Sequence, residues 1–173
     1  MIADSDNDHI KTVYAEYGLA IYLAQCLEHG IANALIYLDL IPRNTRNIHT
    51  REEWADKLDS FMNSNFEQTL GRLIYDINSV STLPTGLRET LAKALKKRNW
   101  LAHDYSRERA TEFMTASGRN MMIQELQEVQ ELFQTADELL DSTFKPVREK
   151  YGFTDNMLET FYKKYFSSIK FHT

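Results

Sequence analysis

Cysteine, glycine and proline are scarce in this 173-residue chain. The single cysteine, Cys26, excludes an internal disulfide and is typical of a reducing compartment, so we expect a cytoplasmic location. Six glycines and three prolines are too few for a chain built from many tight turns. This scarcity of turn residues favours helices over a β-rich fold.

Long apolar runs and several familiar chemical motifs are also missing. No run of 18 apolar residues and no secretion-type N-terminus occurs, so we expect neither a membrane span nor export. The histidines and the cysteine lack zinc-ligand spacing, and we find no glycine-rich phosphate loop or serine-nucleophile motif. We therefore expect no metal and no cofactor.

Apolar residues recur every three or four positions along most of the chain, which is the period of amphipathic helices. We expect Pro42 to close the first helix and Ser117–Gly118 to interrupt the chain before the last long one. Residues 1–173 are predicted to form one all-α domain, an up-and-down bundle of five or six helices, with residues 149–173 as a C-terminal extension helix. The stripes run over residues 10–38, 54–80 (after the capping box Thr50–Glu53), 87–105 and 122–147.

Positive charge is concentrated in residues 88–109. This window holds seven cations and three anions, whereas the whole chain has a net charge of −5. A solvated helix with cations near its C-terminal end explains part of the pattern, because the helix dipole favours them there. The alternative is a local binding site for phosphate groups. The cations are Arg88, Lys93, Lys96, Lys97, Arg98, Arg107 and Arg109.

Two charged residues occupy positions in apolar stripes. Arg98 falls within about 20° of Leu87 and Leu91 on its predicted helix, and Glu28 lies between Ala24 and Ile31 on the first helix. An unpaired buried guanidinium would cost several kcal/mol, so Arg98 needs a partner or a wet groove. The sequence predicts a Glu28–Arg98 ion pair, which would fix the register of two helices or orient the arginine for function.

His103 is a candidate proton-transfer group. On an unbroken helix it would lie about 140° from Arg98, whereas Asn99 and His103, four residues apart, would share a face. Arg98 and His103 can therefore cooperate only if the helix ends between them or if a second subunit brings another copy close. A lone histidine on a helix is otherwise more often a surface or capping residue.

The segment from Arg98 to Tyr105, RNWLAHDY, resembles the signature of the HEPN superfamily (higher eukaryotes and prokaryotes nucleotide-binding). That signature is an arginine, four to six residues, and then a histidine, with a polar residue, often asparagine, after the arginine. A tyrosine two residues after the histidine marks the subset similar to the toxins of HEPN–nucleotidyltransferase pairs. The match is tight over about ten residues and loose over the helical plan.

The resemblance implies a metal-independent endoribonuclease, of the toxin or phage-defence type, that acts as a homodimer on RNA. It implies catalytic roles for Arg98, His103 and Asn99: His103 would move protons, Arg98 would stabilise the phosphorane, and Asn99 would hold the phosphate or the histidine ring. Glu28 would orient Arg98. The residues expected to bind the RNA are Lys96, Lys97, Tyr105, Arg107 and Arg109.

Other functions also fit the sequence. A non-catalytic HEPN-like module that binds nucleotide, RNA or a partner protein need not use both Arg98 and His103. A helical transcriptional co-regulator or adaptor would have no site at all. A toxin-type enzyme would in addition require an antitoxin or another regulatory protein as its partner.

Overall fold

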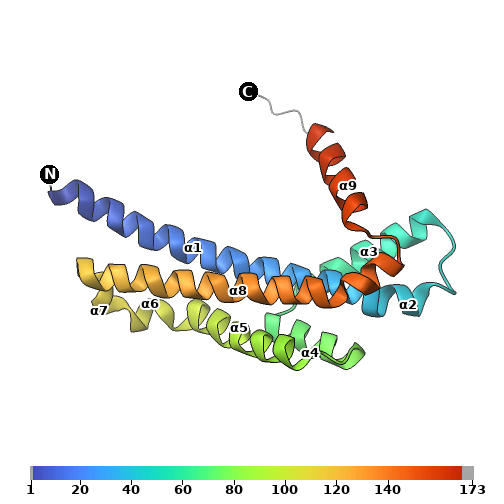
Figure 1. The fold of residues 1–173 in the computed structure, drawn as a ribbon, viewed down its shortest axis with the longest axis horizontal. Coiled ribbons are helices and arrows are strands. Elements are labelled where there is room, and N and C mark those ends of the chain that lie inside the picture. The colour runs from blue at the N-terminus through green and yellow to red at the C-terminus, as the bar shows by residue number, and fades with distance from the viewer. Residues whose placement is uncertain (1, 169–173) are drawn as a thin grey trace.

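The computed structural model describes the backbone of residues 2–168 and the side chains of residues 7–164. Every regular element within residues 2–168 is a helix (Figure 1), so the predicted all-α class is confirmed. The described chain divides into more elements than the five or six predicted. In chain order they are α1 (Ile2–Leu35), the π-helical turn η1 (Ile36–Leu40), α2 (Ile41–Asn44), α3 (Arg51–Phe66), α4 (Leu70–Val80), α5 (Thr85–His103), α6 (Tyr105–Glu108), α7 (Ala110–Phe113), α8 (Ala116–Lys150) and α9 (Asp155–Ser168).

Three long helices, α1, α5 and α8, alternate in direction along the chain, and together with α4 they build the core (Figure 1). The helices α1 and α8 lie side by side and run the same way. His9 Nε2 is 2.9 Å from Asn120 Oδ1 near their starts, and Gln130 Nε2 donates to Glu16 Oε2 over 2.6 Å further along. The apolar stripes of the sequence therefore meet along the axis of the bundle. Fully buried members include Leu27, Ile31, Leu73, Ile77, Leu91, Leu101, Leu126, Val129 and Phe133.

Pro42 does not end the first helical stretch, contrary to expectation. The backbone widens into the π-helical turn, where the Ile41 N–H donates to the Ile36 carbonyl five residues earlier. Pro42 then occupies the first turn of α2, where its missing N–H is not needed. The helical path consequently continues to Asn44, whose side-chain amide donates to the Leu40 carbonyl over 2.7 Å.

The capping box at Thr50 and Glu53 is present and opens α3 as predicted. The stripe over residues 54–80 is divided between two helices, because α3 ends at Phe66. Because Thr69 starts a new helix by accepting from the Arg72 N–H, the phase of the apolar stripe resets there. Phe66 is consequently 49% exposed, although its place in the stripe predicted an inward side chain.

Ser117–Gly118 lies inside the first turn of α8 and does not interrupt it, contrary to expectation. Thr115 caps this helix by accepting from the Gly118 N–H over 3.1 Å. A Cβ at position 118 would meet the Glu112 carbonyl oxygen at 2.1 Å. The sequence suggested a turn at this glycine. The structure shows instead that Gly118 is needed for the close approach of α7 to α8.

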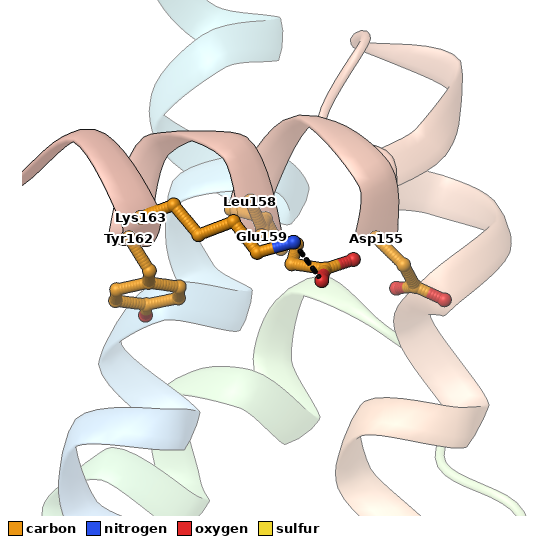
Figure 2. A pocket seen from close by; sticks show the side chains of 5 residues that line it. All are labelled: Asp155, Leu158, Glu159, Tyr162 and Lys163. Carbon is orange, nitrogen blue, oxygen red and sulfur yellow. Dashed lines mark ion pairs between the residues drawn. The ribbon is translucent and has the colours of Figure 1, made fainter.

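The helix α9 leaves the bundle after Gly152, which adopts a φ of 88° (Figure 1). Asp155 at its start pairs with Lys145 and with buried Arg148, so the first turn of α9 is tied to the end of α8. Figure 2 shows Lys163 paired with Glu159 along α9, beside Tyr162. This helix forms most of the predicted extension, and residues 169–173 lie outside the described part of the chain.

One stretch of the described chain, Asn7–Asn44, is long and apolar enough to cross a membrane when judged by length and composition only. Its most apolar window has a mean hydropathy of 1.3, and 39% of that window is buried inside the structure. The core helix of a soluble protein meets the same criterion. The buried face of this stretch packs along α8, which accounts for its apolar composition.

We expect Gly118→Ala to lower the free energy of unfolding by about 1–3 kcal/mol, because the new methyl group overpacks the α7–α8 contact. Gly86→Ala is the matched control, since a Cβ there meets nothing within 4 Å. That control should stabilise the protein by up to about 1 kcal/mol through its helix propensity. Urea unfolding of both variants measures the difference, and equal effects would contradict the close approach at Gly118.

Candidate functional site

Arg98 and Glu28 form the predicted ion pair where α5 meets α1. Arg98 Nε donates to Glu28 Oε1 over 3.2 Å, and the two side chains are 28% and 17% exposed. The terminal nitrogens of Arg98 make no hydrogen bond to any described residue. One edge of the guanidinium is thus held by a carboxylate while its other nitrogens are available to a ligand, and an arginine can bind an anion in this way.

His103 ends α5, and the helix is continuous from Arg98 to His103. The two residues therefore point about 140° apart within one chain. His103 and Asn99 are both exposed, as is Lys96, and the spacings of three and four place all three on one face of α5. A single chain consequently presents its histidine and its arginine on different sides of the helix.

Lysine side chains and Trp100 line an open cleft of about 510 Å³ beside that face of α5. Lys97 Nζ lies 4.5 Å from the centroid of the Trp100 ring, within the range of a cation–π interaction. The Trp100 Nε1–H donates to Glu108 Oε2 over 2.8 Å. Lys93 and Lys96 complete this wall as exposed cations.

The two arginines after the motif already have carboxylate partners. Arg109 donates through Nε and Nη2 to both oxygens of Glu125, at 2.8 and 2.7 Å. These hydrogen bonds raise the pKa of Arg109 above its ordinary value. Arg107 is exposed and pairs with Asp104 over 2.6 Å. Arg107 can exchange this weak surface contact for a phosphate, whereas Arg109 has its charge neutralised inside the protein.

Tyr105 is buried, with 3% of its surface exposed, so its position is incompatible with the expected stacking on an RNA base. Its ring stacks on Tyr17 at 5.5 Å and meets the edge of Trp100 at 4.8 Å. The Tyr105 hydroxyl has no hydrogen-bond partner among the described residues. Burial, and then the nearby Glu125 carboxylate, raise the pKa of this phenol well above its ordinary value.

Tyr17 and Glu125 contribute to this region but were not identified from the sequence. The Tyr17 hydroxyl donates over 2.9 Å to the Leu101 carbonyl, one of the last four carbonyls of α5, which have no partner inside the helix. Tyr17 thus caps the end of α5 from another helix. Its position in the apolar stripe of α1 is a sequence signal for burial but not for this hydrogen bond.

Among residues with described side chains, no group of three or more His, Cys, Asp or Glu could hold a metal ion. No protein-family model, curated protein or solved structure matches this chain. The similarity to HEPN proteins therefore depends on residues 98–105, and the functional argument depends on the geometry of the groups around them.

Tyr105→Phe should raise the free energy of unfolding by about 1 kcal/mol, because it removes a buried hydroxyl that lacks a partner. Tyr17→Phe also removes a hydroxyl, but this one donates to the Leu101 carbonyl. The substitution should therefore lower the free energy of unfolding by about 1 kcal/mol. Denaturant unfolding of the two variants provides the comparison. A loss of stability in Tyr105→Phe equal to that in Tyr17→Phe would show that the Tyr105 hydroxyl has a partner in solution.

Proposed function

We propose that the chain is a HEPN-like, metal-independent endoribonuclease that acts as a homodimer in the cytoplasm. The observation that carries the proposal is the half-buried Arg98, held on one edge by Glu28 and open at its terminal nitrogens. Apolar residues of similar volume often stabilise a helix contact as well as a charged pair does, so stability alone does not explain the charges here. An oriented guanidinium instead suits a phosphate whose charge grows during reaction.

The nearby groups supply the rest of the chemistry. His103 would transfer a proton to or from the ribose 2′-hydroxyl or the leaving 5′-oxygen, since imidazole titrates near neutral pH. Asn99, on the same exposed face, would donate a hydrogen bond to the phosphate. The 2′-oxygen then forms the new bond to phosphorus as the bond to the 5′-oxygen breaks, which leaves a 2′,3′-cyclic phosphate.

A dimer is required because one chain keeps its two principal groups about 140° apart on α5. A second copy related by a two-fold axis beside α5 would set its own His103 opposite Arg98 of the first. Each phosphate would then face one group from each chain.

The exposed face of α1 offers a surface for this association. Every exposed residue between Ala15 and Gln25 is uncharged, and the set includes Leu19 at 43% and Tyr22 at 61% exposure. A Cβ at Gly18 would have nothing within 4 Å, so another helix can approach closely there. The same helix carries Tyr17 and Glu28, which contact α5, so the surface belongs to the helix that packs against the motif.

RNA would reach the site along the cations of α5. Lys93 and Lys96 are exposed at the open cleft, Lys97 lies over Trp100, and Arg107 follows the motif. These groups would contact the phosphate backbone without reading the sequence, so their contribution should fall as salt rises. The remaining chain is acidic, which favours binding at this one surface only.

An enzyme of this kind would need a partner that restrains it, and an antitoxin or another regulatory protein fits that role.

The alternating directions of α1, α5 and α8 support the up-and-down bundle expected for the family, with the short elements α2, α6 and α7 as connections. We further propose that α9 lies outside this minimal bundle, because its ion pairs with Lys145 and Arg148 of α8 are made by Asp155 in its first turn.

Tyr22→Arg should convert the dimer to a monomer, because it places a charge in the proposed apolar contact. Leu58→Arg is a matched control: Leu58 is a similarly apolar, 37% exposed residue, but it lies on α3. Light scattering on wild type and both variants gives the masses. A wild-type monomer at enzyme-assay concentrations would exclude the composite site, and an unchanged mass in Tyr22→Arg would move the interface elsewhere.

His103→Ala and Arg98→Ala should each abolish cleavage of total cellular RNA, and the double variant should cost little more, because the two groups act as one unit. Arg98→Ala also leaves Glu28 unpaired, so Arg98→Lys serves as the control that keeps the charge and loses the planar fork. Cleavage should persist in excess chelator and yield 2′,3′-cyclic ends.

The ribonuclease proposal fails if folded, dimeric wild-type protein leaves total RNA intact, or if His103→Ala cleaves as fast as wild type. In either case the non-catalytic module becomes the better account of the Arg98 site. RNA binding without cleavage, measured by filter retention over a salt series, would then identify the phosphate-binding function of the lysine-lined cleft.

A further inference from the structure

A cavity of about 390 Å³ lies between α1, the short helices α6 and α7, and α8. Its volume is within the range of small-molecule sites in proteins. It is separate from the exposed face that carries Asn99 and His103, and no step of the proposed cleavage uses it. Its walls include Tyr14, Tyr17, Tyr105, Phe113 and Met122, with Arg109 and Ser106 as the polar members.

Aromatic rings dominate the lining. Tyr17 and Tyr105 form a stacked pair with an interplanar angle of 25°, and Tyr14 meets Phe113 at 5.7 Å with a tilt of 41°. Flat ring faces and edges of this kind contact a flat guest over a large area at little entropic cost, because each side chain has few rotatable bonds. The lining therefore favours a planar aromatic molecule over a branched aliphatic one.

The cavity carries almost no net charge. Its only cation, Arg109, is bound through two nitrogens to Glu125, so the pair presents little positive charge to a guest. An anionic ligand would have to compete with Glu125 for Arg109. A cationic ligand would lie against the guanidinium. Both kinds of charge are disfavoured, and a neutral molecule is the one that these walls accept.

The Tyr105 hydroxyl adds one polar requirement. Tyr105 forms part of the cavity wall, and its hydroxyl is buried without a partner among the described residues. A guest that displaces the side chains over this oxygen can offer it an acceptor, and the O–H bond then turns to donate without moving the ring. Burial without a partner is unfavourable, so a ligand that supplies the acceptor gains an interaction that the free protein lacks.

We propose that the cavity bounded by Tyr14, Tyr17, Tyr105 and Phe113 is a binding site for a neutral, planar aromatic molecule that carries a hydrogen-bond acceptor. This inference is independent of ribonuclease activity, because it uses neither His103 nor Arg98. The bound ring would lie among the tyrosines and Phe113, with its acceptor toward the Tyr105 hydroxyl.

Three probes that share one ring system test the proposal on the full chain. Quinoline is neutral at mildly alkaline pH and has a ring-nitrogen acceptor, N-methylquinolinium is a cation without that acceptor, and quinoline-2-carboxylate is an anion. Titrations followed by amide NMR shifts should show quinoline binding near Tyr105 and Phe113. Both charged probes should bind at least about tenfold more weakly, because a charged guest loses its hydration in an aromatic-lined site whose only cation, Arg109, is already paired with Glu125.

Two variants and one control locate the site. Ala110→Leu fills the cavity from its wall and should abolish quinoline binding, whereas Ala116→Leu adds the same bulk to an exposed alanine outside the lining and should change nothing. Tyr105→Phe keeps the ring and removes the donor, so it should weaken quinoline binding by up to about tenfold. Amide spectra of each variant confirm that the fold is retained.

The proposal is overturned if quinoline produces no shifts at millimolar concentration, or if Ala110→Leu binds it as well as wild type. Tighter binding of either charged probe would overturn the neutral class. Unchanged affinity in Tyr105→Phe would overturn the role of the acceptor. Because RNA cleavage is not measured in these titrations, failure of the ribonuclease proposal leaves their outcome unaffected.

Discussion

The contact between Glu28 and Arg98 constrains how α1 and α5 can pack. Each charge occupies a position where its helix is otherwise apolar, so a shift of either helix by one turn would leave a half-buried charge without a partner. Breaking a fully buried pair costs about 3–5 kcal/mol, and this half-exposed pair costs a smaller part of that. A shifted helix therefore loses more free energy through an unpaired charge than the pair adds to stability in the native register. This difference fixes the position of the motif along α1.

That fixed register divides the motif into two faces, one toward α1 and one toward solvent. One face, with Arg98, Leu101 and Tyr105, lies toward α1. There the ring of Tyr17 stacks on Tyr105, and the Tyr17 hydroxyl donates to the Leu101 carbonyl. Asn99 and His103 turn to solvent. A helix cannot present both faces to one substrate atom, so any chemistry that uses Arg98 with His103 has to be completed by a second molecule. The same geometry permits a binding role for one chain alone.

Much of this arrangement was predictable from periodicity. The helical class and the Glu28–Arg98 pair follow from which positions share a helix face, and the capping box at Thr50 follows from a glutamate three residues later. The wrong predictions concern backbone detail. A π-helical turn lets the helical path continue past Pro42, and Gly118 lies within α8 at its close contact with α7. The burial of Tyr105 also agrees with its place at the end of the 87–105 stripe, whereas the pairing of Arg109 with Glu125 depends on how α6, α7 and α8 meet, which no local spacing encodes.

The two proposed sites use different groups, but they depend on the same packing of side chains. Tyr17 and Tyr105 line the cavity, and Tyr17 also bonds to the last turn of α5, whose final residue is His103. Trp100 joins them through its edge contact with Tyr105 and its hydrogen bond to Glu108. The position of His103 therefore depends on aromatic packing inside the protein as well as on the helix that carries it. A guest among these rings would order the end of α5 without touching the exposed face, because the stabilised contacts lie on its opposite side.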